Sequence, residues 1–512
     1  MCVNCAGDFY QGTVWYTKFK YHPMIEFGNW LNYTAMGLGN HDFDDSIGGL
    51  APFAQAAQFP LLAANINETG GAAHHLLPGR LYNRSAVFHV RGVPVGIIGY
   101  ITRTTEYNFP DRDLVFLDEV ESVRAEAELL YSQGVRVLIA LGHSGYEVDM
   151  ELARRVGRLD LVVGGHSHSF LYTPADAADI PADTPEGPYP TYVMNEEILG
   201  KMIPVVQAKA FTKYLGELRL RFDAEGDLLL PVEGTGVVFA RPHLMDSSVE
   251  PDKQTLEKMA VWQANLTEYK EVVGSTLVEV KEEDSDSVES NMGNLLTDSM
   301  AAVYENTTIA FLNNGGIRNR FEVGNITLED ILFVLPFENT VDLLEMPGKA
   351  LRQALERAAA KLDPDDPTKY PGFGLQMAGL KVNITVSGAN NGSRVQQILV
   401  KSVEGEYEEL VDEQTYRVAI GSFLAPAGRQ RSRRGIFDDL EGATHTPGSV
   451  VDATALKDWV ARMSPLSPQV EGRLTVTYDT TDTNGGVGKT KAVGILWLLT
   501  VVVTVLWQAS RF

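Results

Sequence analysis

The chain contains very little cysteine and comparatively little positive charge. Cys2 and Cys5 are the only cysteines in 512 residues, so a fold stapled by several disulfides is excluded. Lys and Arg number 43 against 67 Asp and Glu, which gives a net charge of −24. Such an acidic chain is not a nucleic-acid binder, because phosphate backbones are held by Lys and Arg. It can still handle small anions where metal ions or a local Arg supply positive charge.

An apolar leader is also lacking, because residues 1–20 show no basic start followed by an apolar run. Sequons nevertheless indicate the secretory route, since they are more numerous than we expect by accident. The alternative is that they are accidental and unmodified. The eight sequon asparagines are Asn32, Asn67, Asn83, Asn265, Asn306, Asn325, Asn383 and Asn391.

The C-terminal tail, in contrast, is strongly apolar. Residues 492–510 carry no charge and follow the small, polar stretch TDTNGGVGKTK. Small residues, a polar spacer and an apolar tail are typical of a GPI-anchor signal. A single membrane-spanning helix is the alternative, which we favour less because Lys489 and Lys491 precede the apolar segment. We therefore expect a GPI-anchored glycoprotein on the extracellular side of the plasma membrane, whose natural N-terminus and signal peptide precede Met1.

The length favours two domains, and the apolar pattern favours the α/β class. Five short runs rich in Val, Ile and Leu do not alternate with polar residues, as is typical of strands buried on both faces. Between two of them, residues 119–133 have apolar positions at helical spacing and end at Gly134. The predicted strands are residues 34–39, 59–66, 93–100, 135–142 and 159–165.

The sequence changes character near residue 239, where prolines and an acidic turn precede a helix-like run over residues 255–273. We place the domain boundaries accordingly. The predicted divisions are a first domain over residues 1–238, a connection over 239–270, a second domain over 271–477, and a linker with the apolar anchor signal over 478–512.

Polar residues of the metal-ligating types follow several of the predicted strands. The segments are Ala-Gly-Asp ending at Asp8, GNHDFD over 39–44, Gly-His-Ser over 142–144 and GGHSH over 164–168. Any one of them alone is more often a turn or a loop histidine. Together they predict a metal site, because the carboxyl ends of parallel strands meet at one edge of a sheet.

These segments resemble the metallophosphoesterase-type 5′-nucleotidases, in particular the membrane-anchored ectoenzymes of that family. The resemblance rests on AGDFYQGTVWY, GLGNHDFD, LGHSG and VVGGHSH, and in the second half on NMGNLL, FLNNGGIRN, ILFVLPFENT and VEGRL. It covers roughly residues 6–475. It implies a calcineurin-like metallophosphoesterase domain followed by a 5′-nucleotidase C-terminal α/β domain.

The resemblance also implies roles for individual residues. Two divalent metal ions, which we expect to be zinc, would be held by Asp8, Asn40, His143, His166 and His168, with Asp8 bridging both. His41 and Asp44 match the catalytic pair. The residues that match substrate contacts are Asn313, Arg318, Phe337 and Phe423, of which the two phenylalanines match the rings that sandwich the base.

The chain departs from the family pattern in three places. No Asp-x-His motif precedes Asp8, although the family uses those two side chains to complete the first metal site. We therefore expect a first domain that lacks its first strand, and a chain that binds the first ion weakly and is catalytically impaired as given. Asp286 falls where relatives have an Arg, and Arg429 falls where they have the turn that holds the ribose. The loop from Arg429 to Arg434 also fits a basic processing site, although a solvated basic loop is the favoured alternative.

We therefore expect an enzyme that hydrolyses nucleoside 5′-monophosphates such as AMP at the cell surface. A hydrolase of nucleoside di- or triphosphates or nucleotide sugars is one alternative. A catalytically impaired surface protein that binds ligands is the other. The expected partners are a nucleotide substrate and the membrane, through the lipid anchor, and not nucleic acid. The sequence leaves open whether the chain forms a homodimer.

Overall fold

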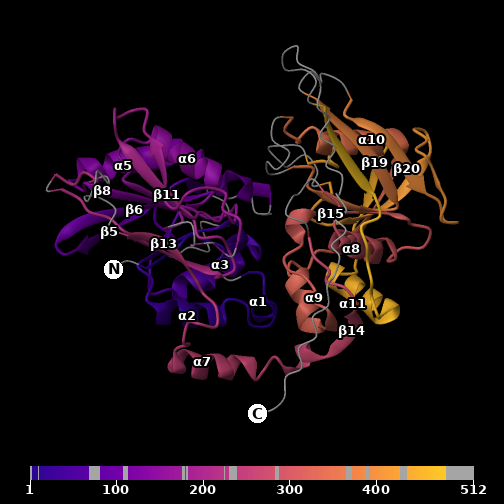
Figure 1. Ribbon diagram of the computed structural model, residues 1–512, viewed down its shortest axis with the longest axis horizontal. Coiled ribbons are helices and arrows are strands. Elements are labelled where there is room, and N and C mark those ends of the chain that lie inside the picture. Colours follow the sequence, from indigo (N-terminus) through magenta and orange to yellow (C-terminus); the bar gives the residue numbers. More distant parts are fainter. Residues whose placement is uncertain are drawn as a thin grey trace, which may run out of the picture.

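The computed structural model describes residues 3–9, 11–68, 81–107, 114–175, 179, 181, 183–223, 225–229, 239–282, 288–364, 372–387, 393–426 and 435–479. Two α/β lobes lie side by side, and helix α7 (Lys253–Gln263) runs along one end between them (Figure 1). None of the helices in this described part combines the length and apolar character needed to span a bilayer. The apolar tail, Asp286, Asn391 and the loop from Arg429 to Arg434 lie outside the described residues.

The first lobe is built on two sheets. Strands β1, β2 and β3 form a parallel sheet, and a second sheet has the order β10-β11-β9-β8-β6-β5, with a parallel centre and antiparallel edge strands. Its elements are β1 (Asn4–Cys5), α1 (Val14–Phe19), α2 (His22–Leu31), β2 (Ala35–Gly37), η1 (Asn40–Phe43), α3 (Ser46–Ala56), β3 (Leu61–Leu62), β4 (Ile66–Glu68), β5 (Ser85–Val90), β6 (Val93–Ile101), η2 (Arg103–Tyr107), β7 (Leu114–Phe116), α5 (Glu119–Ser132), β8 (Val137–His143), α6 (Tyr146–Arg155), β9 (Leu161–Val163), β10 (Thr191–Met194), β11 (Met202–Val206), β12 (Tyr214–Arg219) and β13 (Phe239–Leu244).

The predicted strands appear, with one difference. The expected strand over residues 59–66 is divided into β3 and β4, because the chain turns between them. The buried Asn65 side chain explains this turn, since its amide donates to the carbonyl of Ile101 at 2.7 Å and accepts from the Ile101 amide at 3.0 Å. These hydrogen bonds take the place of strand pairing. The predicted helix over residues 119–133 is α5, and Gly134 follows it in a left-handed conformation, with φ 95°.

The two sheets of the first lobe pack closely against each other. Ala35, Leu62, Ile97 and Leu141 are buried between them. A Cβ atom at Gly99 would lie 2.2 Å from the carbonyl carbon of Leu62, so only glycine permits this separation of the sheets. The close packing holds the ends of strands from both sheets against one another.

The helix-like run over residues 255–273 is shorter in the structure than predicted. Helix α7 ends at Gln263, η3 (Thr267–Lys270) follows, and Val272 already begins strand β14 (Val272–Thr276). The Asn265 side chain donates to the carbonyl of Val261 at 3.1 Å, a local hydrogen bond that competes with continued helix.

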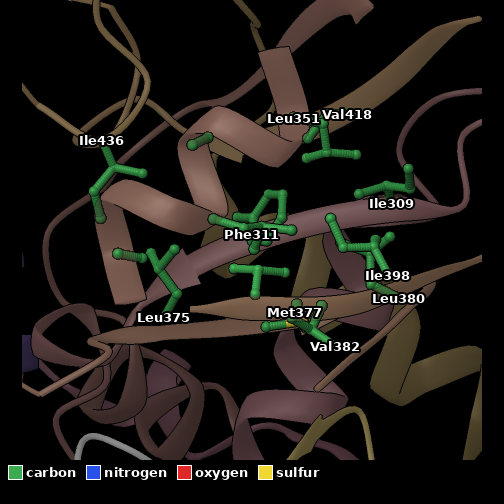
Figure 2. Packing of buried hydrophobic residues seen from close by; sticks show 14 of the residues in the cluster. Ile309, Phe311, Leu351, Leu375, Met377, Leu380, Val382, Ile398, Val418 and Ile436 are labelled. Atoms are coloured by element: carbon green, nitrogen blue, oxygen red, sulfur yellow. The ribbon is translucent and has the colours of Figure 1, made fainter. Parts of the chain in front are cut away.

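The second lobe has a five-stranded sheet with the order β18-β15-β22-β17-β23, and a four-stranded sheet with the order β21-β20-β19-β24. One core lies around α10 and the four-stranded sheet (Figure 2), and another lies beneath α8, α9 and α11. Its further elements are α8 (Asn291–Ala301), β15 (Ile309–Asn313), η4 (Asn314–Gly316), β16 (Gly324–Thr327), α9 (Leu328–Val334), β17 (Val341–Pro347), α10 (Gly348–Ala359), β18 (Leu375–Ala378), β19 (Leu380–Ser387), β20 (Val395–Lys401), β21 (Tyr407–Glu409), β22 (Thr415–Gly421), β23 (Thr444–Thr446), α11 (Asp452–Met463) and β24 (Leu474–Asp479).

Arg473, in the VEGRL segment, ties the start of β24 to helix α8. Its guanidinium donates to both carboxylate oxygens of Asp298 at 2.8 and 2.9 Å and to the carbonyl of Met377 at 3.1 Å. Its own backbone N–H donates to the buried Glu289 at 2.6 Å. This polar cluster therefore connects the start of β24 with helix α8 and with strand β18 of the other sheet.

We expect the substitution Arg473→Leu to lower the free energy of unfolding of the second lobe by about 2 kcal/mol, because the hydrogen bonds of the buried guanidinium to Asp298 and to the carbonyl of Met377 are lost. Chemical denaturation would measure the loss. Arg219→Leu is the matched control, since Arg219 forms an exposed ion pair with Glu217 and should change stability by less than about 0.5 kcal/mol. An equal effect of the two substitutions would contradict the structural role of Arg473.

Candidate functional site

Four of the predicted metal ligands follow strands of the first lobe and lie together. Asp8 follows β1, Asn40 begins η1 after β2, His143 ends β8, and His166 follows β9. Because β1 and β2 are parallel, as are β8 and β9, the carboxyl ends of each pair share one edge. Asp8 and His166 both have left-handed backbones, with φ 53° and 77°, which is uncommon for residues other than glycine and is typical of functional sites.

The four side chains form two pairs of oxygen and imidazole nitrogen. Nε2 of His143 lies 2.8 Å from Oδ2 of Asp8, and Nδ1 of His166 lies 3.0 Å from Oδ1 of Asn40. The rings of the two histidines are 5.1 Å apart. Carboxylate, amide and imidazole groups are ligands of divalent metal ions in proteins.

The pairing of His143 with Asp8 fits a cation. Nδ1 of His143 contacts the carbonyl oxygen of Ala6 at 2.6 Å and so carries a proton, which leaves Nε2 facing the carboxylate without the geometry of a hydrogen bond. A lone pair and a carboxylate in such close contact need a proton or a metal ion between them. No three His, Cys, Asp or Glu side chains of the described residues are gathered as a metal site.

The electrostatics of the first pair favour an ionised carboxylate beside a positive charge. Burial favours the neutral carboxyl, but His143 and His41 together hold the pKa of Asp8 well below its usual range. Burial opposes the charged form of His143, yet Asp8 raises its pKa. The pKa of His166 falls to about 3, chiefly through burial and then through His143, so its imidazole is neutral and able to bind a metal at neutral pH.

His168, the fifth predicted ligand, lies two residues beyond His166. Burial and then the charge of Arg318 lower its pKa to about 4, so this imidazole is also neutral. Its ring lies beside that of Phe211, with centroids 5.2 Å apart and planes at 71°. The backbone of His168 is left-handed, with φ 56°.

The predicted catalytic pair is joined to the second lobe. Nδ1 of His41 lies 2.8 Å from Oδ2 of Asp44, and Nε2 of His41 lies 2.7 Å from Nη2 of Arg318. Because a guanidinium only donates, Nε2 accepts this bond and Nδ1–H donates to Asp44. The ring of Phe337 stacks on His41 with centroids 4.8 Å apart, and Arg318 lies over the same ring at 5.0 Å. The site is therefore formed between the two lobes.

The remaining predicted substrate residues lie at one edge of the five-stranded sheet. Asn313 ends β15, and Phe423 follows the end of β22, which runs parallel to β15. The Phe423 side chain is 38% exposed, whereas Phe337 is half-buried against His41. The two phenylalanines thus come from different segments of the second lobe.

Gln376 was not identified from the sequence, although it supports the loop that begins at Asn313. It is buried, accepts from the Ser290 amide at 3.1 Å, and donates to the side-chain oxygen of Asn314 at 3.2 Å and to the carbonyl of Val288 at 2.9 Å. A lone amide within the apolar strand β18 is the signal that could have found it. Gln376 therefore fixes the start of α8 and the loop after β15 relative to each other.

Two further polar residues support the GGHSH loop. Asp149 is fully buried and accepts from the hydroxyl of Tyr100 at 2.7 Å and from the amide of Gln207 at 3.2 Å, and burial raises its pKa to about 7. Gln207 also donates to the carbonyl of Gly165 and accepts from the Ser169 amide.

A Cβ atom at Gly164 would overlap Asp149, so glycine is required there. No sequence motif indicated these contacts.

Comparison with known proteins identifies both lobes. Residues 2–170 match the family of calcineurin-like phosphoesterases, and residues 272–431 match the 5′-nucleotidase C-terminal domain. Calcineurin-like phosphoesterases work with divalent metal ions. The carboxylate, amide and imidazole groups gathered here are chemically able to bind such ions. The first lobe and its site thus define the chain as a metallophosphoesterase.

The whole-chain comparisons define the family more closely. The chain is 35% identical to a 5′-nucleotidase of Diplobatis ommata over 491 residues, and 34% identical to that of Homo sapiens over 490 residues. These alignments cover 92% of this chain and 80% and 81% of the two relatives. The crystal structure of a 5′-nucleotidase precursor from Thermus thermophilus has a TM-score of 0.82 at 33% identity, over 93% of this chain and 90% of that one. The chain belongs to the 5′-nucleotidase family, and its two-domain fold is the one expected from the sequence.

Proposed function

We propose that this chain hydrolyses nucleoside 5′-monophosphates, such as AMP, to nucleoside and phosphate with the help of two zinc ions. The observation that carries the proposal is the contact between His41 of the first lobe and Arg318 and Phe337 of the second. This contact brings the predicted metal ligands beside His41 together with the guanidinium of Arg318, which suits a phosphate, and the ring of Phe337, which suits a base. A nucleotide spanning the two lobes would meet all three.

The metal-binding residues in this proposal are Asp8, Asn40, His143, His166 and His168. When bound, two divalent ions supply a hydroxide near neutral pH and offset charge on the phosphoryl group. Asp8 touches both His143 and the backbone N–H of His41, so it links the metal ligands to the catalytic pair. This position suits the bridging role.

Each remaining side chain has a task that follows from its contacts. Asp44 holds the His41 ring with Nε2 directed toward Arg318. Once Nε2 has taken up a proton, it would stabilise the transition state or protonate the leaving oxygen from this position. Arg318 offsets the phosphate charge through its guanidinium. Phe337 and Phe423 pack against the faces of the base, a contact that tolerates different bases because it makes no hydrogen-bond demand. Asn313 adds a polar contact from the end of β15.

We further propose that the enzyme acts at the cell surface as a GPI-anchored glycoprotein. All seven sequon asparagines within the described residues have exposed side chains, which supports glycosylation of each. The anchor signal lies outside the described residues. Treatment of cells with a phosphatidylinositol-specific phospholipase should release the enzyme, and retention on the membrane would favour a spanning segment.

The function is tested by comparing substrates at saturating zinc. We expect release of phosphate from AMP, with far lower rates on ADP, ATP and UDP-glucose. Preferred turnover of the last three would instead support hydrolysis of di- and triphosphates or nucleotide sugars. No turnover of any of them by the full-length protein would contradict an enzymatic role.

A further inference from the structure

Residues 209–212, a short segment between β11 and β12, have a strained backbone. Lys209, Phe211 and Thr212 all have left-handed conformations, with φ of 60°, 57° and 54°. For a β-branched residue such as threonine this conformation is a genuine outlier. Such strain persists only where surrounding contacts impose it, and it concentrates at functional sites.

The segment is fastened to the loop that carries His168. The N–H of Lys209 donates to the carbonyl of Ser169, the next residue after His168, at 3.0 Å. The ammonium groups of Lys209 and Lys213 lie 3.3 and 2.7 Å from the carboxylate of Asp183. These contacts fix both ends of the segment and so determine where Phe211 lies.

Phe211 is placed against His168 and not in a core. Its side chain is 70% exposed, so its burial contributes little to folding stability. Its ring is nevertheless 5.2 Å from the imidazole of His168, with the planes at 71°, an edge-to-face arrangement that aromatic rings prefer. The strained segment thus carries an exposed ring that lies beside this histidine.

The ring of His168 lacks the kind of polar contact that the rings of His143 and His166 make. Nδ1 of His143 is held by the carbonyl of Ala6, and Nδ1 of His166 lies beside the Asn40 oxygen. Within the described part of the chain, no hydrogen bond from the ring of His168 is found. A metal-binding imidazole needs a second contact to fix its ring, and Phe211 provides one through packing.

We propose that Phe211 is a positioning residue that holds the imidazole of His168 toward the metal site and thereby strengthens binding of one of the two ions. The inference rests on the proposed function only in taking His168 as a metal ligand. This role would account for the strained backbone of residues 209–212, which packing in a core does not explain.

The test is a zinc titration of the full-length protein, by competition with a chromophoric chelator. We expect Phe211→Ala to weaken one of the two zinc equivalents roughly 10- to 100-fold and to leave the other unchanged. Phe211→Trp, which retains an aromatic ring, should restore most of the affinity. Phe239→Ala is the matched control, because Phe239 is 37% exposed and stacks on His243 at 5.8 Å outside the site. It should leave both equivalents unchanged.

Three outcomes would overturn the inference. The first is that Phe211→Ala binds both zinc ions as tightly as the wild type. The second is that both equivalents weaken together with a fall in the unfolding temperature, which indicates a merely structural role. The third is that the wild type binds no second ion. A wild type that binds two zinc ions but does not hydrolyse AMP would instead refute the proposed function and leave the role of Phe211 standing.

Discussion

Replacing Asp8 by alanine is expected to abolish phosphate release from AMP, with a loss on the order of a thousandfold or more. The Asp8 carboxylate contacts Nε2 of His143 and accepts from the backbone N–H of His41. In the proposed function it would also help to hold both metal ions. Its loss therefore removes metal affinity and the positioning of the catalytic histidine at once. Turnover and zinc content per chain, measured at saturating zinc, would check this expectation.

Asp8→Asn is the informative companion variant. It retains the side-chain volume and an oxygen that can accept from His41, but it removes the charge. We expect it to remain severely impaired, because a neutral amide does not offset two cations. Asp160→Asn removes a buried carboxylate elsewhere in the lobe, where it pairs with Lys201, and should retain zinc content. Turnover near the wild-type rate in Asp8→Ala would refute the bridging role.

Replacing His41 by alanine is expected to slow turnover by roughly 10²- to 10⁴-fold while metal content stays nearly intact. His41 directly follows the predicted ligand Asn40, yet both of its nitrogens are already engaged. Nδ1 faces Asp44 and Nε2 faces Arg318. These contacts orient the ring, and in the proposed function the loss of His41 removes a group beside the phosphate and not a metal ligand. Single-turnover kinetics together with elemental analysis would separate the two effects.

Asp44→Asn provides the comparison for His41. The amide keeps the shape but donates and accepts differently, so it should disturb the orientation of the His41 ring and cause a smaller loss than His41→Ala. His243→Ala, outside the site, serves as the control for the loss of a half-exposed histidine paired with a carboxylate. Loss of a zinc ion in His41→Ala would make His41 a metal ligand and contradict its assignment.

The arrangement between the lobes explains how so acidic a chain can handle an anionic substrate. The net charge of −24 opposes binding of phosphate esters in general. Arg318 brings a local positive charge to the first lobe, where it meets His41. In the proposed function, substrate binding would therefore depend on a few fixed charges at this place and not on the overall field of the protein.

The sequence by itself determined the layered α/β class and the segments that carry the chemistry. Runs such as residues 93–100 and 135–142 are rich in apolar residues without alternation, which is typical of strands buried on both faces, and β6 and β8 lie there. The family resemblance of GNHDFD and GGHSH, together with the second-half motifs, was sufficient to recognise a metallophosphoesterase of the 5′-nucleotidase type, and the comparisons confirm it. Local patterns carry this information because backbone preference and strand burial are properties of consecutive residues.

The tertiary structure alone decided which distant residues meet. Arg318 and His41 are 277 positions apart, and nothing in either segment specifies that they touch. The turn at Asn65, the support of Asn314 by Gln376 and the placement of Phe211 beside His168 have the same character. Each depends on one polar or aromatic side chain whose partner lies on another strand or loop. Such contacts leave no periodic pattern in the sequence, because they are selected by the three-dimensional packing of the sheets and not by the residues on either side.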